Sequence, residues 1–478
     1  MRIPSIALFL LTLASPAQAI NFVISSAADS GAGSLRQAIL SSNSPAGGAH
    51  TMTFSVTFPT NGVILLNSNL PQILSQSLKI MGDSKKPKID GQSLHAVFSV
   101  GSGTSIFEIS DLTLQNGWAP EKGGCVNSGD YSTVSRLKAE RVVFSNCQAS
   151  GPSLIRGGAI YWNRTSGSVS LIDSQFFDNS VTATATNGQS GGGAVYASTS
   201  LSSLRTLFVG NSAGAASGGG TGGAIALSGT QTSSSITEST FRFNGASRGM
   251  SLLGYGGAVY AGCDNCQVQI VRTYLRGNSA YDGGAVYARK PSAGAMDVYL
   301  SLSNSTLYNN SVVNRGGSVY IGKNTSLSSS NNTFYNADAS DGAHLGFEMG
   351  AEVNYFRANL LAPTYVGSAC SGTPTITNPG FVGFNLLSDA SCSIFSANAL
   401  PNSPLGSVTV DEPAGQIGVL RFSGSAVIDS ITNGTICEPR DARFQVRPID
   451  GDGDGFAYCD VGAYEDPRDI IFINGFEA

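Results

Sequence analysis

The sequence has few charged residues and no excess of basic ones. Asp, Glu, Lys and Arg make up 12% of the 478 residues, about half of the roughly 25% found in typical soluble domains. With 27 Lys+Arg against 32 Asp+Glu, the formal net charge is -5. Such a chain lacks the basic surface that binds nucleic acid or an anionic membrane, so we expect no nucleic-acid partner. The low charge also argues against an expanded, disordered chain.

Long apolar runs are also missing, apart from a short one at the N-terminus. Residues 1–19 contain one basic residue, Arg2, then an apolar run over 6–13 and a small-x-small triplet that ends at Ala19. This pattern predicts a secretory signal peptide that is cleaved after Ala19. The run is shorter than the roughly 20 apolar residues that span a bilayer. We therefore predict a secreted mature chain, extracellular or associated with the outer membrane surface, without a transmembrane segment.

The eight cysteines fit an oxidising compartment. Three pairs share a separation of 22 residues, namely Cys125 and Cys147, Cys370 and Cys392, and Cys437 and Cys459. We predict that each forms a disulfide between adjacent coils of a repeat structure. Cys263 and Cys266 have the CxxC spacing of redox and zinc sites, but no second thiol pair or nearby histidine accompanies them. A disulfide that clips a loop is therefore favoured over catalysis.

An internal repeat organises the middle of the chain. A Gly-Gly-Ala-[Ile/Val] motif recurs at second-glycine spacings of 34, 35, 30, 34, 27 and 33 residues, starting from a degenerate copy at 123–126. Between copies, an apolar residue lies three positions before an asparagine, as in Phe176 and Asn179 or Phe208 and Asn211. This period indicates a solenoid. Units rich in Gly, Ser, Thr, Asn and Val favour strands over the helices of ankyrin or tetratricopeptide repeats.

Each recurring position has an expected structural role. The β-branched residues that follow Gly-Gly-Ala predict one inward aliphatic column, and the Phe or Leu residues predict a second. The asparagines are expected to stack at a turn, with each amide bonded to the next. The double glycine is expected to supply positive φ or close approach between coils, where a Cβ would clash.

A tyrosine follows the β-branched residue in five copies of the repeat. Strand alternation places these side chains on the face opposite the core. They are Tyr161, Tyr196, Tyr260, Tyr287 and Tyr320. One interpretation is an outward ladder of exposed rings that stacks against an extended glycan. The other is that variable loops cover the rings, which then only pack the wall.

These motifs carry a resemblance to known proteins. The alternation of Gly-Gly-Ala-[Ile/Val] with Phe-x-x-Asn over about 123–336 resembles the repeat of the chlamydial polymorphic outer membrane proteins. The resemblance implies a surface-exposed right-handed β-helix with a role in adhesion. Segments 33–39 and 459–465 resemble the ends of a broader family of secreted bacterial β-helix proteins. Gly33 and Gln37 replace the Cys and Glu of that family's N-terminal signature.

The expected fold is all-β, a right-handed parallel β-helix with a short N-terminal capping helix. Ser34 can cap that helix, whose apolar side would cover the first coil. We divide the chain into a signal peptide, an N-terminal cap, the β-helix and a C-terminal tail, at 1–19, 20–50, 51–465 and 466–478. A monomer is expected.

An acidic loop near the C-terminus is the candidate metal site. Asp450, Asp452 and Asp454 occupy alternate positions, with glycine sixth, as in the first half of a calcium loop. Position twelve is Val461 instead of the bidentate glutamate. Calcium binding and a solvated Asp-Gly turn both remain open, and no other cofactor is expected.

The sequence favours a binding protein of the cell surface or extracellular space, such as an adhesin that recognises glycans or cell surfaces. The alternative is a polysaccharide lyase or glycoside hydrolase of the pectin-lyase-like β-helix type, which needs clustered acid–base groups. His50, His95 and His344 are far apart and no paired-Asp motif occurs, so no catalytic residue is assigned. A groove that gathers Asp, Glu, Lys or Arg side chains would favour the enzyme.

Overall fold

The computed structural model describes most of the chain. The described residues are 19–44, 48–185, 187–216, 218–230, 233–246, 253–290, 297–362, 367–395, 405–413, 417–432, 434 and 436–467. The signal peptide, except Ala19, and all but the first two residues of the C-terminal tail lie outside this set.

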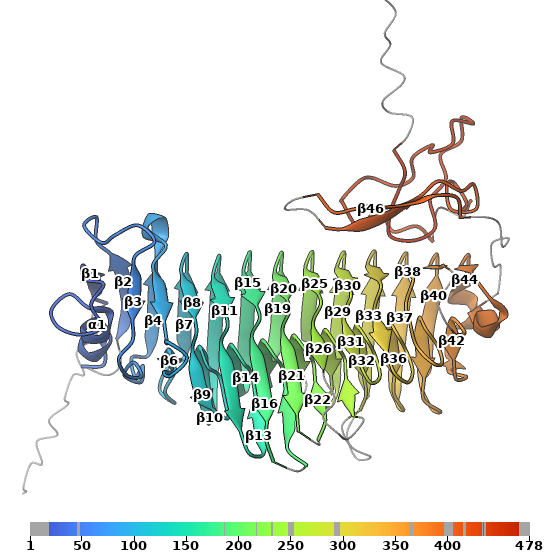
Figure 1. The fold of residues 1–478 in the computed structure, drawn as a ribbon. Coiled ribbons are helices and arrows are strands. Elements are labelled where there is room, and N and C mark those ends of the chain that lie inside the picture. The colour runs from blue at the N-terminus through green and yellow to red at the C-terminus, as the bar shows by residue number, and fades with distance from the viewer. Residues whose placement is uncertain are drawn as a thin grey trace, which may run out of the picture.

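The described residues form a parallel β-solenoid whose coils stack along one axis (Figure 1). One wall is a 12-stranded parallel sheet, composed of β3 (Val63–Leu65), β5 (Lys88–Asp90), β8 (Thr113–Gln115), β11 (Val143–Ser145), β15 (Gln175–Phe177), β20 (Leu207–Val209), β25 (Thr240–Arg242), β30 (Tyr274–Arg276), β34 (Thr306–Tyr308), β38 (Thr333–Tyr335), β41 (Leu360–Leu361) and β45 (Leu386–Leu387). The parallel β-helix predicted from the repeat is confirmed, and its right-handed sense stays a prediction.

The largest wall is a 22-stranded sheet. Its strands are β1 (Asn21–Ile24), β2 (Ala49–Phe54), β4 (Ser77–Met81), β6 (Phe98–Ser99), β7 (Ile106–Ser110), β10 (Val126–Glu140), β14 (Ile160–Ile172), β18 (Val195–Ala197), β19 (Ser200–Leu204), β23 (Ile225–Leu227), β24 (Ser233–Thr237), β28 (Val259–Ala261), β29 (Cys266–Val271), β32 (Val286–Ala288), β33 (Val298–Ser303), β36 (Val319–Ile321), β37 (Thr325–Ser330), β39 (Leu345–Phe347), β40 (Glu352–Arg357), β42 (Cys370–Ser371), β43 (Thr375–Ile376) and β44 (Val382–Gly383).

Two smaller parallel sheets extend the middle coils. A seven-stranded sheet contains β9 (Trp118–Pro120), β12 (Gln148–Gly151), β16 (Ser180–Ala183), β21 (Ser212–Ala215), β26 (Gly245–Ala246), β31 (Ser279–Ala280) and β35 (Ser311–Val312). A four-stranded sheet, which we call the extension sheet, contains β13 (Leu154–Arg156), β17 (Gln189–Gly191), β22 (Gly220–Thr221) and β27 (Gly254–Tyr255). Each strand of the extension sheet runs into the double glycine that precedes the next strand of the large sheet.

Both predicted apolar columns are confirmed. Val195, Ile225 and Val259 are direct register partners on β18, β23 and β28, and all three are fully buried. The second column is a stack of Phe rings with centroid separations of 4.5, 4.8 and 4.6 Å, formed by Phe144, Phe176, Phe208 and Phe241. Because the strands are in register, equivalent side chains of successive coils meet directly and form a continuous core.

The predicted asparagine stack is also confirmed. The Nδ2 group of Asn211 donates to Oδ1 of Asn244 at 2.9 Å, and Nδ2 of Asn244 donates to Oδ1 of Asn278 at 3.0 Å. The stack begins at Asn179 and ends at Asn310, and all five side chains are buried. These amides supply the polar partners that a buried turn requires.

The two glycines of each repeat have different roles. Gly222, the first, has φ of +60°, which a residue with a Cβ rarely adopts. Gly223, the second, lies against the next coil, where a Cβ would overlap the carbonyl oxygen of Gly257. Both roles expected from the sequence are therefore present in each repeat, one per glycine.

The N-terminal end is capped as predicted. Helix α1 (Leu35–Ser42) begins after Ser34, whose side chain accepts a hydrogen bond from the backbone N–H of Gln37. Its buried residues include Leu35 and Ile39, which join the solenoid core. The helix therefore shields the first coil from solvent.

The C-terminal end differs from the prediction that the β-helix continues to residue 465. Parallel stacking ends at β45, and the short 3-10 helix η3 (Ala390–Phe395) closes the last coil, with the Phe395 ring stacked 4.2 Å from that of Phe356. Strands β46 (Val408–Asp411) and β47 (Val419–Phe422) form an antiparallel pair in a segment that folds back over the solenoid (Figure 1). We call the described residues among 405–467 the return segment. The prediction fails because the Gly-Gly-Ala and Phe-x-x-Asn signals that direct stacking do not recur there.

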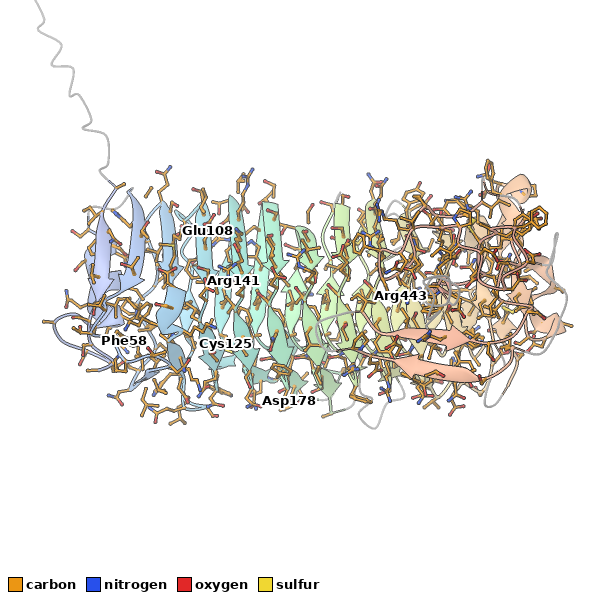
Figure 2. The ribbon with its side chains drawn as sticks, turned by 90° about the horizontal axis from the view of Figure 1, so that it is seen from above. Phe58, Glu108, Cys125, Arg141, Asp178 and Arg443 are labelled. Atoms are coloured by element: carbon orange, nitrogen blue, oxygen red, sulfur yellow. A yellow bond between two sulfur atoms is a disulfide. The ribbon has the colours of Figure 1, made fainter. Side chains whose placement is uncertain are left out.

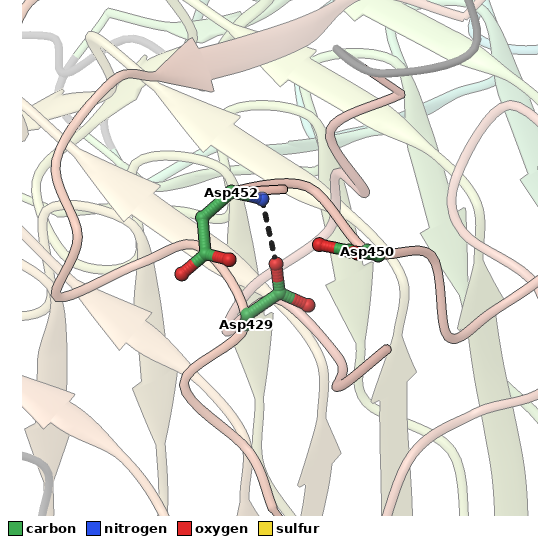
Figure 3. Close-up of side chains that lie close together, drawn as sticks. All are labelled: Asp429, Asp450 and Asp452. Atoms are coloured by element: carbon green, nitrogen blue, oxygen red, sulfur yellow. Dashed lines mark hydrogen bonds between the residues drawn. The ribbon is translucent and has the colours of Figure 1, made fainter. Parts of the chain in front are cut away.

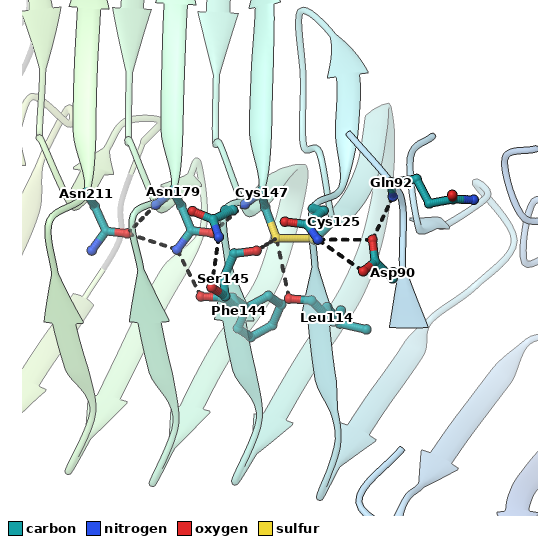
Figure 4. The surroundings of a disulfide bond; sticks show 11 residues. Asp90, Gln92, Leu114, Cys125, Phe144, Ser145, Cys147, Asn179 and Asn211 are labelled. Atoms are coloured by element: carbon teal, nitrogen blue, oxygen red, sulfur yellow. Dashed lines mark hydrogen bonds between the residues drawn. A yellow bond between two sulfur atoms is a disulfide. The ribbon is translucent and has the colours of Figure 1, made fainter. Parts of the chain in front are cut away.

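All four predicted disulfides are formed, with Cα–Cα distances of 5.6, 5.8, 5.2 and 6.3 Å. The expected link between adjacent coils is wrong. Cys125 and Cys147 lie in the same coil, before β10 and after β11 (Figure 4), because one coil takes about as many residues as the double-glycine spacing, which exceeds 22. Cys370 and Cys392 likewise belong to the last coil, and Cys437 and Cys459 lie in the return segment.

The described residues include no helix of the length and apolarity that crossing a membrane would require.

Candidate ligand-binding surfaces

The five repeat tyrosines lie on the outer face of the large sheet, as strand alternation predicts, but they do not form an exposed row. The exposed fractions of Tyr161, Tyr196, Tyr287 and Tyr320 are 1%, 5%, 2% and 3%, and Tyr260 is half-buried. Consecutive rings stack at centroid separations of 5.3 Å (Tyr161 and Tyr196), 5.7 Å (Tyr260 and Tyr287) and 5.0 Å (Tyr287 and Tyr320). The exposed ladder is therefore wrong for four rings, which pack the wall as in the other interpretation.

Neighbouring side chains cover these rings. Tyr161 donates a hydrogen bond to Asp130 and lies 5.4 Å from Nζ of Lys122. The Tyr255 ring lies 4.7 Å from that of Tyr287. Sequence reasoning missed this cover. Lys122 and Tyr255 each directly precede a double glycine, so their constant offset from the repeat was the available signal.

The ladder lacks one ring. Tyr196 on β18 pairs in register with Ala226 on β23, and Ala226 pairs with Tyr260 on β28. Successive strands lie about 4.8 Å apart, so the rings of Tyr196 and Tyr260 are separated by two strand spacings. Alanine at this position leaves one rung of the stack empty.

A cavity of about 340 Å³ lies at this empty rung, between the large sheet and the extension sheet. Tyr196, Ala226 and Tyr260 line it from the large sheet, and Arg156, Thr221 and Tyr255, which share one face, line it from the extension sheet. The cavity thus combines aromatic surface with a hydroxyl group and one cation. This volume lies within the range of small-ligand sites.

A larger groove of about 600 Å³ lies between the solenoid and the return segment. Asp173, Arg205 and Glu238 line it from the solenoid, and Glu412 and Arg443 line it from the return segment. Figure 2 shows Arg443 in this segment above the C-terminal half of the solenoid. The groove gathers acidic and basic side chains, which is the feature that would favour the enzyme alternative.

The charged groups that the solenoid contributes to the groove include members of a row that sequence reasoning missed. In six successive coils the residue three positions before the Phe or Leu of the second core column is charged, with alternating sign, in the order Asp111, Arg141, Asp173, Arg205, Glu238 and Arg272. Arg141 pairs with Asp111 and Arg205 with Asp173, both at 2.7 Å, and Arg272 pairs with Glu238 at 3.3 Å. The alternation at a constant offset was the available signal.

Glu412 anchors the return segment to the solenoid. Its carboxylate accepts hydrogen bonds from Tyr274 at 2.5 Å, from Arg276 at 2.6 Å and from Arg242. Desolvation alone would raise the pKa of Glu412, but the hydrogen bonds from Tyr274 and Arg276 and the nearby arginines lower it below its ordinary value. A general acid needs a raised pKa, so Glu412 is suited to anchoring and not to proton donation.

The acidic loop gathers two of its three predicted residues. Asp450 and Asp452 approach Asp429, with one carboxylate oxygen of each within 4.8 Å of the others, whereas Asp454 stays outside the group (Figure 3). Asp429 comes from a distant part of the sequence and accepts backbone hydrogen bonds from Gly451 and Asp452 at 2.6 and 3.0 Å. Desolvation raises the pKa of Asp429 above its ordinary value. Calcium at this loop stays a prediction.

The three histidines do not converge on one site. His344 is fully buried and its Nε2 contacts the carbonyl oxygen of Ala362 at 2.6 Å. His50 is buried beside Phe22, near the N-terminal cap. Burial lowers the pKa of both imidazoles, to about 4 for His344. These are core residues and not acid–base groups of a cleft.

The burial of His344 predicts a loss of stability in mild acid. Its pKa of about 4 in the folded protein lies below the ordinary histidine value of 6.5, so the unfolded chain binds the proton more tightly. The contribution of the neutral His344 to the free energy of unfolding is present above pH 6.5 and is lost as the pH falls toward 4. Between pH 7 and pH 5 this loss amounts to about 2 kcal/mol. Asp389 is the charged group that acts on this imidazole, and it opposes the shift.

Urea unfolding of the wild type and of His344→Gln at both pH values tests this expectation. The variant keeps an amide donor for Ala362, but its side chain does not titrate in this range. Its free energy of unfolding should therefore decrease by about 2 kcal/mol less than that of the wild type between pH 7 and pH 5. Equal decreases in the two proteins would contradict the assignment.

Comparison of the chain with protein-family models and with curated proteins finds no match.

Proposed function

We propose that the protein is an exported binding protein of the cell surface or extracellular space, an adhesin that recognises glycans. The observation that carries the proposal is the cavity at the empty rung of the tyrosine ladder. Sugar rings present apolar C–H faces and hydroxyl edges, which match aromatic rings and polar side chains respectively. Tyr196, Tyr255 and Tyr260 supply the aromatic surface, and Arg156 and Thr221 supply polar groups.

Three features of the sequence and one of the structure support the proposal. The signal-peptide pattern supports export. The Gly-Gly-Ala and Phe-x-x-Asn repeat resembles that of surface-exposed right-handed β-helices with a role in adhesion, and the C-terminal motif resembles the ends of secreted bacterial β-helix proteins. The four disulfides agree with an oxidising location outside the cytoplasm.

A glycan array with the mature protein tests recognition at this cavity. Tyr260→Ser removes one aromatic wall, and we expect binding of the recognised glycans to weaken at least 10-fold, because a stacked aromatic contact contributes about 1 kcal/mol beyond its buried area. The control is Tyr299→Ser, which removes an exposed tyrosine of β33 that does not line the cavity. Both variants should keep the circular-dichroism spectrum of the wild type.

The outcome separates recognition from fold. Equal weakening in both variants, or unchanged binding in Tyr260→Ser, would contradict recognition at the cavity. Absence of binding to every glycan on the array would contradict the proposed function itself.

A further inference from the structure

The empty rung has the dimensions of one inserted ring. Within the ladder, filled neighbours stack at 5.3, 5.7 and 5.0 Å. Tyr196 and Tyr260 are two strand spacings apart, so a ring midway between them would lie about 4.8 Å from each. This separation falls within the range in which rings stack in proteins. The position of Ala226, buried at 2% exposure, is where a tyrosine of this repeat would otherwise begin.

The polar groups of the cavity have a definite charge. Arg156 is the one charged side chain among the described lining residues, and no carboxylate lines the cavity. Its Cζ atom lies 4.5 Å from the centroid of the Tyr196 ring, so the guanidinium is held beside the ring that borders the empty rung. No ion pair joins Arg156 to a carboxylate of the described residues. A guanidinium in such a position can hold a ligand carboxylate through two parallel hydrogen bonds.

A second polar group lies on the same face of the extension sheet as Arg156. Gly191 on β17 is the register partner of Arg156 on β13 and of Thr221 on β22, so Thr221 also faces the cavity. Its Oγ1 atom donates a hydrogen bond to the carbonyl oxygen of Ser190 at 3.1 Å. The same hydroxyl oxygen can accept a hydrogen bond from a hydroxyl of a ligand.

We propose that the cavity binds a carboxylated pyranose, an acidic sugar residue of a glycan, whose ring takes the place of the missing tyrosine between Tyr196 and Tyr260. The sugar ring stacks on both aromatic neighbours, its carboxylate pairs with Arg156, and a ring hydroxyl donates to Thr221. This inference rests on the proposed glycan-binding function and adds the class of sugar and its position.

The key variant is Ala226→Tyr, in which the protein fills its own empty rung. The introduced ring would continue the stack and occupy the space assigned to the sugar. We expect binding of the acidic glycans to fall at least 100-fold, while the melting temperature stays the same or rises because a cavity is filled. Ala226→Leu fills part of the same space with less strain and serves as the second variant if the tyrosine is not accommodated. We expect Ala226→Leu to weaken binding of the acidic glycans at least 10-fold.

The probes are matched pairs of oligosaccharides that differ only by a carboxylate. Examples are oligogalacturonate against oligogalactose and oligoglucuronate against oligoglucose. Binding is screened on an array and measured by calorimetry. The wild type should prefer the acidic member of at least one pair at least 10-fold. Arg156→Gln should abolish that preference while neutral binding remains. Arg315→Gln, which changes an arginine beside Tyr320 and outside the cavity, is the matched control and should leave the preference intact.

The outcomes distinguish this inference from the proposed function. If Ala226→Tyr and Ala226→Leu leave glycan binding unchanged, the claim that a sugar ring inserts at this rung is overturned. If the wild type binds acidic and neutral members equally, the claim that the sugar is acidic is overturned. In both cases glycan recognition by the protein would stand. Absence of binding to every glycan would overturn the proposed function and the inference together.

Discussion

The substitution Gly223→Ala is expected to lower the free energy of unfolding by about 3 kcal/mol or more. A Cβ at this position would overlap the carbonyl oxygen of Gly257 in the next coil and would lie 2.5 Å from the backbone nitrogen of Gly245. All of these are backbone atoms in hydrogen-bonded strands, so no side chain can rotate away. The two coils would have to separate locally, which would break the register on which the core columns depend.

Chemical denaturation followed by circular dichroism measures this effect. Gly380→Ala is the matched control, because a Cβ at Gly380, in the short 3-10 helix η2 (Pro379–Phe381), has no heavy atom within 4 Å. Its unfolding free energy should stay within about 0.5 kcal/mol of the wild type. A Gly223→Ala protein as stable as this control would show that the coils are not packed as closely as the structure has them.

The second large effect is expected at the asparagine stack. Asn244→Leu keeps the volume of the side chain but removes both of its polar groups. Oδ1 of Asn244 accepts from the backbone N–H of Asn211 at 3.0 Å and from its Nδ2 at 2.9 Å, and Nδ2 of Asn244 donates to the carbonyl oxygen of Phe208 and to Oδ1 of Asn278, both at 3.0 Å. Four buried polar groups would lose a partner, at about 1 kcal/mol each, so we expect a loss of about 4 kcal/mol.

Hydrogen exchange gives a local measure of the same change. The amide proton of Asn211 should exchange faster in Asn244→Leu than in the wild type, beyond the increase that lower global stability produces. Asn354→Ala is the control, since Asn354 accepts a single exposed hydrogen bond from Thr377 at 2.8 Å. If Asn244→Leu destabilises no more than this control, the stack does not contribute to stability.

The parallel stacking and its core columns could be predicted because they depend on one position per coil. A repeated Val, Phe or Asn meets its own copy in the next coil, so the period alone indicates which residues touch. The same reasoning located the disulfide partners, because equal spacings suggested the pairs. It misplaced them on adjacent coils because a coil was assumed to be about 22 residues long, although the double-glycine spacing already indicated a longer one.

The candidate sites could be predicted only in part. The tyrosine positions were evident from the repeat, and the absence of a tyrosine at Ala226 was visible in the sequence but was not interpreted. Its significance depends on Arg156, Thr221 and Tyr255 of the extension sheet, each of which directly precedes a double glycine. Their constant offset is visible in the sequence, whereas the folding of this sheet over the tyrosines is not. Likewise, Asp429 joins Asp450 and Asp452 only after the return segment folds.

The amino-acid order by itself therefore determined the architecture, since stacking in register needs only a local pattern that recurs along the chain. The tertiary structure alone decided which faces are accessible. It buried four tyrosines under neighbouring side chains, opened a cavity at the rung of Ala226, and turned the described part of the return segment back over the solenoid. These features arise from contacts between different sheets or between distant segments, and a recurring position by itself does not indicate which of them meet.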